Sequence, residues 1–154
     1  MKHSLFLLVT FVFFFAATSC EKEDVDTVKP EIILIEPAED DTLFIGHEVH
    51  IDMELSDNVK LKSYKIDIHS NFDGHGHTKS ASANVPWSFS KSWDISGLRN
   101  TSIHHHEIAV PATINGAPIA TGHYHFTVYV TDESGNENKV ITDVIVGFGT
   151  PREE

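Results

Sequence analysis

The sequence is poor in cysteine and in basic residues, and each shortage excludes a class of protein. It has 1 cysteine among 154 residues, so no disulfide can form within the chain. Its 11 lysines and arginines stand against 23 aspartates and glutamates, giving a formal net charge of −12 with neutral histidines. Nucleic-acid binding depends on basic patches, so no nucleic-acid partner is expected, and cations are the better candidates.

The sequence also lacks the motifs of hydrolytic enzymes. It contains no nucleophile elbow, no HExxH and no convincing pair of carboxylates. A zinc-dependent hydrolase would need an open coordination position beside a general base, and Glu107, directly after a run of histidines, is the one candidate. No catalytic residue is predicted. We therefore expect a protein that is not an enzyme, with a zinc hydrolase as a remote alternative.

One long hydrophobic run lies near the start of the chain, from Leu5 to Ala17. It is shorter than the about 20 residues of a membrane-spanning helix and fits the apolar core of a signal peptide. The run ends in Ala17-Thr18-Ser19-Cys20, which resembles the lipobox of bacterial lipoproteins. That resemblance implies a signal peptide over residues 1–19 and a lipid (palmitate) anchor on Cys20 that holds the protein to a membrane. The alternative is an ordinary secreted protein.

The segment after Cys20 carries information about location. Glu21-Lys22-Glu23-Asp24 resembles the export signal of surface lipoproteins in Bacteroidetes, which implies the outer membrane and exposure on the cell surface. Charged residues also make a solvated tether, so the same residues fit a plain linker over 20–29. Asp26-Thr27-Val28 within it resembles an O-glycosylation site of the same bacteria.

Beyond this tether, short alternating segments predict strands and no helix. Alternation on the last long segment places Tyr124, Phe126 and Val128 on the core side, with Ile66 and Trp93 from earlier segments. Many short strands favour an all-β fold, an antiparallel β-sandwich of one domain over residues 30–148, with a C-terminal tail at 149–154. The predicted strands cover residues 32–35, 47–55, 63–69, 85–95, 108–111, 122–131 and 140–146.

Several motifs resemble a bacterial immunoglobulin-like domain. Tyr124, early in the penultimate predicted strand, resembles the tyrosine corner of that fold. More narrowly, four segments resemble the DUF4625 family, lipoproteins known only as a domain of unknown function. They are Phe72 to His75, His104 to His106, Ile108 to Pro111 and Gly122 to Phe126. The resemblance implies a fold but no activity. Compared with a generic immunoglobulin-like module, residues 97–121 are interpreted as an insertion.

The sequence is rich in histidine, with 11 residues that are unevenly spread. Residues i and i+2 of a strand share a face, so His123 and His125 should lie opposite Tyr124, on the outer face of the sheet. His69 should also face outward, from a strand that pairs antiparallel with the strand of His123. These three histidines should converge at one pole, where the loop Phe72–His77 begins.

A His-x-His pair on a strand can supply two imidazoles to one metal ion, and neutral imidazole suits zinc, copper or nickel. Where His104 to His106 lie depends on strand register: beside His69, which we favour, or at the far pole. His47 and His50 are interpreted as exposed residues without a role, and His105 as solvated. The predicted ligand set for zinc or copper is His69, Asp73, His75, His77, His104, His106, His123 and His125.

Two functions follow from these observations. The first is a surface lipoprotein that binds a divalent transition metal through its histidines, for capture or for delivery to an outer-membrane transport partner. The second is a structural or adhesive module that binds a protein or glycan. The turns at Asp57-Asn58 and Asp132–Asn136 leave calcium open as a weaker alternative, because Asp and Asn also cap turns without any ion.

Overall fold

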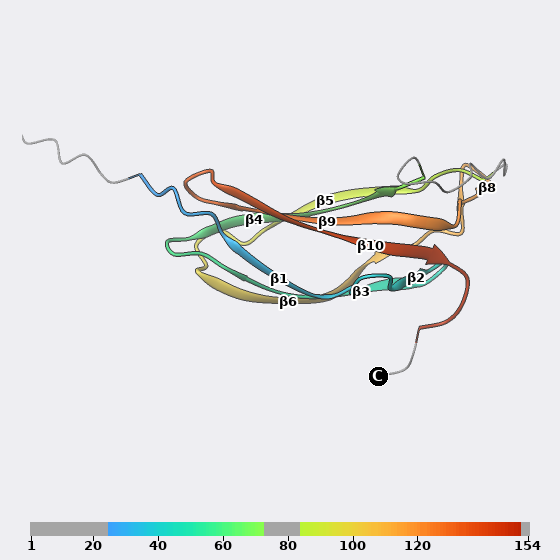
Figure 1. Cartoon of the computed structure of the whole chain (residues 1–154), viewed down its shortest axis with the longest axis horizontal. Coiled ribbons are helices and arrows are strands. Elements are labelled where there is room, and N and C mark those ends of the chain that lie inside the picture. The colour runs from blue at the N-terminus through green and yellow to red at the C-terminus, as the bar shows by residue number, and fades with distance from the viewer. Residues whose placement is uncertain (1–24, 73–83, 152–154) are drawn as a thin grey trace, which may run out of the picture.

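The computed structural model describes residues 25–72 and 84–151, which form a β-sandwich of two layers (Figure 1). The three-stranded sheet has the order β1 (Glu31–Glu36), β3 (Glu48–Ser56) and β6 (Asn100–Ala109). The five-stranded sheet has the order β2 (Thr42–Phe44), β10 (Glu137–Gly147), β9 (Gly122–Asp132), β4 (Leu61–Ser70) and β5 (Ser88–Asp94). A short hairpin joins β7 (Thr113–Ile114) to β8 (Ala117–Pro118).

The expected all-β sandwich of one domain is confirmed, since the described residues contain strands and no helix. One pair departs from the antiparallel expectation: β2 runs parallel to β10, with Thr42 opposite Ile145. Within the described ranges, no helix is long and apolar enough to cross a membrane.

In one layer β3 lies beside β6, and in the other β10, β9 and β4 are adjacent. Tyr124, near the start of β9, is held by two hydrogen bonds. Its buried hydroxyl donates a hydrogen bond to the carbonyl of Ala120 at 2.8 Å and accepts one from the backbone N–H of Trp87 at 3.2 Å. Because a buried hydroxyl without partners is costly, this pair of bonds ties β9 to the segment directly before it and to the segment directly before β5.

The core lies between the inner faces of the two sheets. Alternate residues of β9, Tyr124, Phe126 and Val128, are fully buried there, as the sequence pattern predicts. Ile66 is also buried, whereas Trp93 is only partly buried and stacks on Tyr64 with ring centroids 4.9 Å apart. The core positions of the sequence analysis are therefore correct, with Trp93 at the rim.

The expectation that residues 97–121 are an insertion is wrong for the first part of this segment. That part holds β6, which pairs with β3 over Glu48–Ser56 and forms one edge of the three-stranded sheet. The apolar alternation in β6 is weak, since Thr101, Ile103 and His105 are only partly buried. The short strand predicted at 108–111 is the end of β6 and the residues that follow it.

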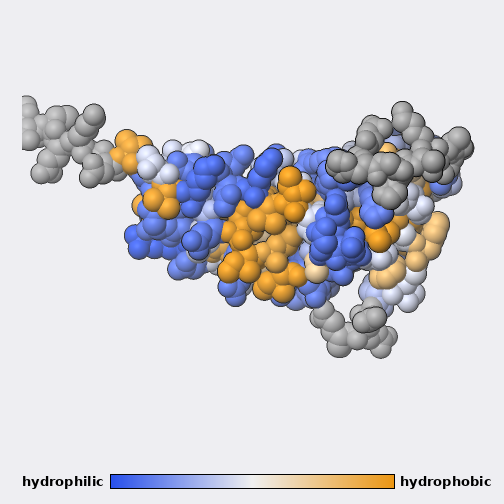
Figure 2. Space-filling model, viewed as in Figure 1, coloured by the Kyte–Doolittle hydropathy of each residue, from blue (hydrophilic) through white to orange (hydrophobic). Residues whose placement is uncertain are grey.

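The described ends of the chain lie at opposite poles of the sandwich (Figure 1). Residues 25–30 lead into β1 at the pole of the β3–β4 and β9–β10 turns, which we call the tether pole. Figure 2 shows an apolar patch on the surface over β1 and β10, where the side chains of Ile33, Ile35 and Ile141 are exposed.

Candidate metal centre

Three histidines meet on the outer face of the three-stranded sheet. His50 comes from β3, and His104 and His106 come from β6. One nitrogen of each imidazole lies within 4.8 Å of one nitrogen of the other two. The ring of His50 stacks on that of His106 at 4.7 Å and stands edge-on to that of His104 at 4.8 Å. We call this group the His50 site.

A β-bulge produces this convergence. Val49 is opposite Ile108 and Ile51 is opposite His105, so two residues of β6, His106 and Glu107, stand opposite His50 alone. A bulge bends its strand and re-aims side chains. His104 and His106 therefore remain on the outer face while Ile108 still reaches the core, where it is fully buried.

The distances at the His50 site fit a transition metal. His50 Nε2 and His104 Nδ1 are 3.3 Å apart. Two nitrogens bound to one tetrahedral zinc at 2.0–2.1 Å would be separated by about 3.3 Å. On the other side of the ring, His50 Nδ1 lies 3.3 Å from Glu36 Oε2 of β1. A carboxylate there favours the tautomer with its proton on Nδ1, which keeps the Nε2 lone pair for a metal.

The middle histidine of the run points the other way, into the rim of the sandwich. His105 Nε2 lies 3.1 Å from the hydroxyl of Tyr64, and its Nδ1 accepts a hydrogen bond from the backbone N–H of Glu107 at 3.3 Å. Since Nδ1 accepts, the neutral ring carries its proton on Nε2 and donates to Tyr64. Glu107 itself accepts hydrogen bonds from Lys91 at 2.6 Å and from Trp93 Nε1 at 3.0 Å. His105 is thus part of the packing between β5 and β6, and its expected solvation is wrong.

Burial and hydrogen bonds shift the pKa values of His105, Tyr64 and Glu107 at this rim. Burial lowers the pKa of His105, an effect that Glu107 opposes and that Lys91, His106 and His104 reinforce. Burial, with a smaller contribution from Glu107, raises the pKa of Tyr64, so its hydroxyl stays protonated. Hydrogen bonds from Lys91 and Trp93 lower the pKa of Glu107. The arrangement therefore favours a neutral His105 between a neutral Tyr64 and an ionised Glu107.

The lowered pKa of His105 predicts a loss of stability in mild acid. In the unfolded chain this histidine takes up a proton near pH 6.5, whereas in the folded chain it does so only at lower pH. The unfolded state therefore binds more protons as the pH falls below about 6.5, and the free energy of unfolding decreases until the pH passes the folded-state pKa.

The measurement is the thermal midpoint from pH 7.5 to pH 5 in EDTA, for the wild type and for His105→Gln. Glutamine can still hydrogen-bond to Tyr64 but does not titrate, so the variant should show a flatter decline. Equal slopes for the two proteins would contradict the prediction.

A second pair of histidines lies on the outer face of the five-stranded sheet. His69 of β4 is directly opposite His125 of β9, with ring centroids 5.4 Å apart. His69 Nδ1 lies 2.8 Å from Asp67 Oδ1, and His125 Nε2 lies 3.2 Å from Asp143 Oδ1. The expected pairing of these two strands is therefore correct. His123 shares this face, but among the described residues it forms no three-residue group with His69 and His125 within 4.8 Å.

The structure places the described residues of the predicted ligand set on two different sheets. His104 and His106 lie on a different sheet from His69, so the favoured placement beside His69 is wrong. His50, which the sequence analysis set aside, is their partner. The His-x-His spacing of His104 and His106 was the available signal, whereas His50 could be found only from strand register. Asp73, His75 and His77 lie outside the described residues, and their role stays a prediction.

No curated protein matches the sequence. Among solved structures, the chain is similar to the sporulation control protein Spo0M from Bacillus subtilis, with 15% identity and a TM-score of 0.38. The match covers 77% of this chain and 48% of that one, so the chain spans about half the length of that protein. The model of a family described as a domain of unknown function matches residues 18–146, and the chain therefore belongs to the DUF4625 family.

Proposed function

We propose that this protein is a surface lipoprotein that binds a divalent transition metal at the His50 site, for capture or for delivery to an uptake partner. The observation that carries the proposal is the convergence of three imidazole nitrogens, from His50, His104 and His106, within 4.8 Å of one another. A single histidine on an exposed strand would carry no meaning, but three from two strands, with a carboxylate behind one of them, form an ordered donor set.

The donor chemistry favours zinc or copper. Three neutral imidazoles supply nitrogen ligands of the kind that zinc and copper prefer over calcium or magnesium. Three protein ligands leave a fourth position of a tetrahedral ion for water or for a donor from a partner. His104 and His106 are exposed, so a partner could reach a metal held there. An open position suits transfer of the ion better than permanent storage.

The place of the His50 site in the fold supports this reading. Ser56, at the end of β3, is opposite Glu31 at the tether pole, and His50 lies six residues earlier on the same strand. At about 3.3 Å per residue, the site is roughly 20 Å from that pole. A domain anchored through Cys20 would therefore hold its metal away from the membrane, toward a partner or the medium.

The second candidate is an adhesive module, and the exposed patch of Ile33, Ile35 and Ile141 is the observation that favours it. Metal titration separates the two functions. The full chain, purified in detergent without a histidine tag and stripped with EDTA, should bind about one zinc or copper ion. Bound metal should also raise the thermal midpoint, because it favours the folded state by mass action. Absence of both effects at 0.1 mM metal would leave the adhesive module as the better reading.

Lipid anchoring predicts a clear effect of one substitution. Cys20→Ala removes the thiol that would carry the lipid, so the protein should appear in soluble fractions or remain as an unprocessed precursor. Membrane fractionation and metabolic labelling with a fatty acid measure this, with Ser19→Ala as a matched control. A Cys20→Ala protein that fractionates and migrates like the wild type would show that the anchor is elsewhere or absent.

A further inference from the structure

Three aspartates from distant parts of the sequence meet at the tether pole. Asp26 precedes β1, Asp57 lies in the turn after β3, and Asp132 ends β9. One carboxylate oxygen of each lies within 4.8 Å of one oxygen of the other two. Asp132 is fully buried, and the other two are partly buried. We call these residues the tether-pole aspartates.

Part of this cluster is accounted for by ordinary turn capping. Asp57 Oδ2 accepts a hydrogen bond from the backbone N–H of Val59 at 2.8 Å. Asp132 accepts from the backbone N–H and the side-chain amide of Asn136, both at 2.7 Å. Asp26 Oδ1 accepts from Val28 N–H at 3.1 Å and from Asn58 Nδ2 at 3.0 Å. The bond from Asn58 is the main reason that the pKa of Asp26 is below its usual value.

Capping does not account for the remaining oxygens. Asp26 Oδ2 and Asp57 Oδ1 are buried and accept no hydrogen bond from any residue in the described ranges 25–72 and 84–151. Buried carboxylate oxygens without partners are rare in proteins, because such an oxygen loses its hydration and no hydrogen bond or ion pair replaces it. Two of them in one cluster, beside a third buried carboxylate, indicate that a ligand of positive charge is the missing partner.

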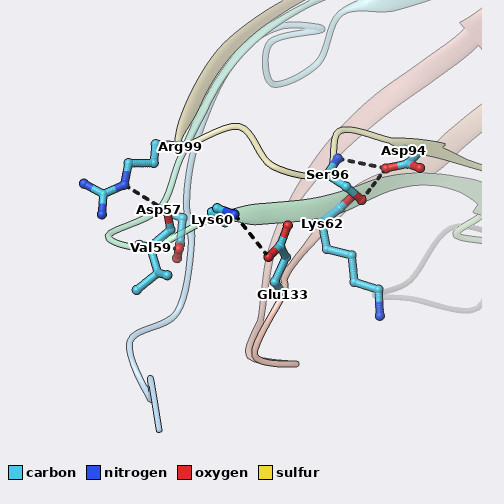
Figure 3. Close-up of polar contacts among 8 residues, drawn as sticks. All are labelled: Asp57, Val59, Lys60, Lys62, Asp94, Ser96, Arg99 and Glu133. Carbon is cyan, nitrogen blue, oxygen red and sulfur yellow. Dashed lines mark hydrogen bonds and ion pairs between the residues drawn. The ribbon is translucent and has the colours of Figure 1, made fainter. Parts of the chain in front are cut away.

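The basic side chains nearby do not fill that role. Figure 3 shows the Asp57 turn, where Arg99 Nε donates to the carbonyl of Val59 at 3.0 Å. It also shows Lys60, which pairs with Glu133 at 4.0 Å. Among the residues that the structure describes, no lysine or arginine forms an ion pair with a tether-pole aspartate.

We propose that the tether-pole aspartates bind a calcium ion that fastens the N-terminal segment to the sandwich. Calcium takes six to eight oxygen ligands at 2.3–2.6 Å, so oxygens up to about 5 Å apart can share one ion. Three carboxylates can supply up to six oxygens, and water can supply the rest. The donor set holds oxygen alone, which suits calcium and not the metals of the His50 site.

Asp26 connects the proposed calcium site to the N-terminal segment that precedes β1. Asn136 Nδ2 donates to the Asp26 carbonyl at 3.1 Å and Asn138 Nδ2 donates to the Pro30 carbonyl at 2.9 Å, so the segment is already docked against the β9–β10 turn. Asp26 is six residues after Cys20 in the sequence. An ion shared by Asp26, Asp57 and Asp132 would turn the last part of the tether into a fixed extension of the domain. If Cys20 carries the lipid, bound calcium fixes the orientation of the domain relative to the membrane.

The test is a calcium titration of the full chain in detergent, stripped with EGTA. Extracellular calcium modules bind with a dissociation constant on the order of 0.1–1 mM, so 5 mM calcium should raise the thermal midpoint by about 3 °C or more. Calcium should also slow amide hydrogen exchange at residues 25–30. Asp26→Asn and Asp57→Asn should each remove most of the shift and the protection.

Asp40→Asn is the matched control and should keep both effects, because Asp40 lies in a turn outside the cluster with a φ of 64° that asparagine tolerates. His50→Ala should also leave the calcium response unchanged, which separates this site from the His50 site. An unchanged midpoint and unchanged exchange in the wild type at 5 mM calcium would overturn the proposal. So would a calcium response that survives in both Asp26→Asn and Asp57→Asn.

Discussion

Replacing Phe126 by alanine is expected to lower the free energy of unfolding by about 3–5 kcal/mol, as large-to-small changes at aromatic core positions do. Phe126 is fully buried in the middle of β9, between Ile68 of β4 and Thr142 of β10 in the register of the sheet. The neighbours of an interior strand are held by hydrogen bonds on both sides, so they cannot collapse into the space that the ring leaves. Small domains have only about 5–15 kcal/mol of stability, so the variant should be much closer to unfolding.

Chemical unfolding monitored by tryptophan fluorescence measures this change. The matched control is Ile141→Ala on β10, whose side chain is 51% exposed on the outer face. Removal of an exposed side chain changes stability by about 0.5 kcal/mol or less. If Phe126→Ala cost no more than Ile141→Ala, the inward face of β9 would have been assigned wrongly.

The sequence predicted most of the fold because the long strands of the five-stranded sheet alternate clearly. In β9, the fully buried Tyr124, Phe126 and Val128 alternate with His123 and His125, which are only partly buried. A period of two is sufficient to assign both the strand and its inner face. The hydrogen-bonding role of Tyr124 was expected for a different reason, its resemblance to a tyrosine corner, and not from the alternation.

The parts that were missed depend on irregular or short strands. In β6 the inward residues are Ile103, His105 and Ile108, with spacings of two and then three because of the bulge. That change of period hid the strand, so residues 97–121 were interpreted as an insertion. β2 has only three residues and pairs with the distant β10, which no local pattern reveals.

The same bulge explains why half of the candidate site was predictable. His104 and His106 were predicted as ligands from the histidine run itself. Their partner His50 depends on which strand lies beside β6, and that segment had been interpreted as an insertion with no strand to pair. Glu36 depends on the neighbour beyond that, β1, and on the irregular register after Leu34. A site assembled from three adjacent strands can be predicted only from the sheet order, which is a long-range property.

Replacing His50 and His104 together by alanine is expected to weaken zinc binding by more than about a hundredfold, because loss of an outer-shell partner alone costs 10–100-fold. These two side chains supply the nitrogens that lie 3.3 Å apart. Glu36→Gln should have a smaller effect, about tenfold, because a neutral amide still orients the His50 ring but makes its imidazole a weaker donor. Competition against a zinc-binding dye at pH 7.5 measures all three affinities.

The informative control is the pair His69→Ala and His125→Ala on the opposite sheet. Both histidine pairs face outward, so both double variants should fold, and near-UV circular dichroism can verify this. Loss of binding only with the His50 and His104 pair would assign the metal to the three-stranded sheet. Loss only with the His69 and His125 pair would assign it to the five-stranded sheet, where the sequence alone predicted it. The two sites lie on opposite faces of the sandwich and cannot share an ion, so full binding in both variants would rule out each as the principal zinc site.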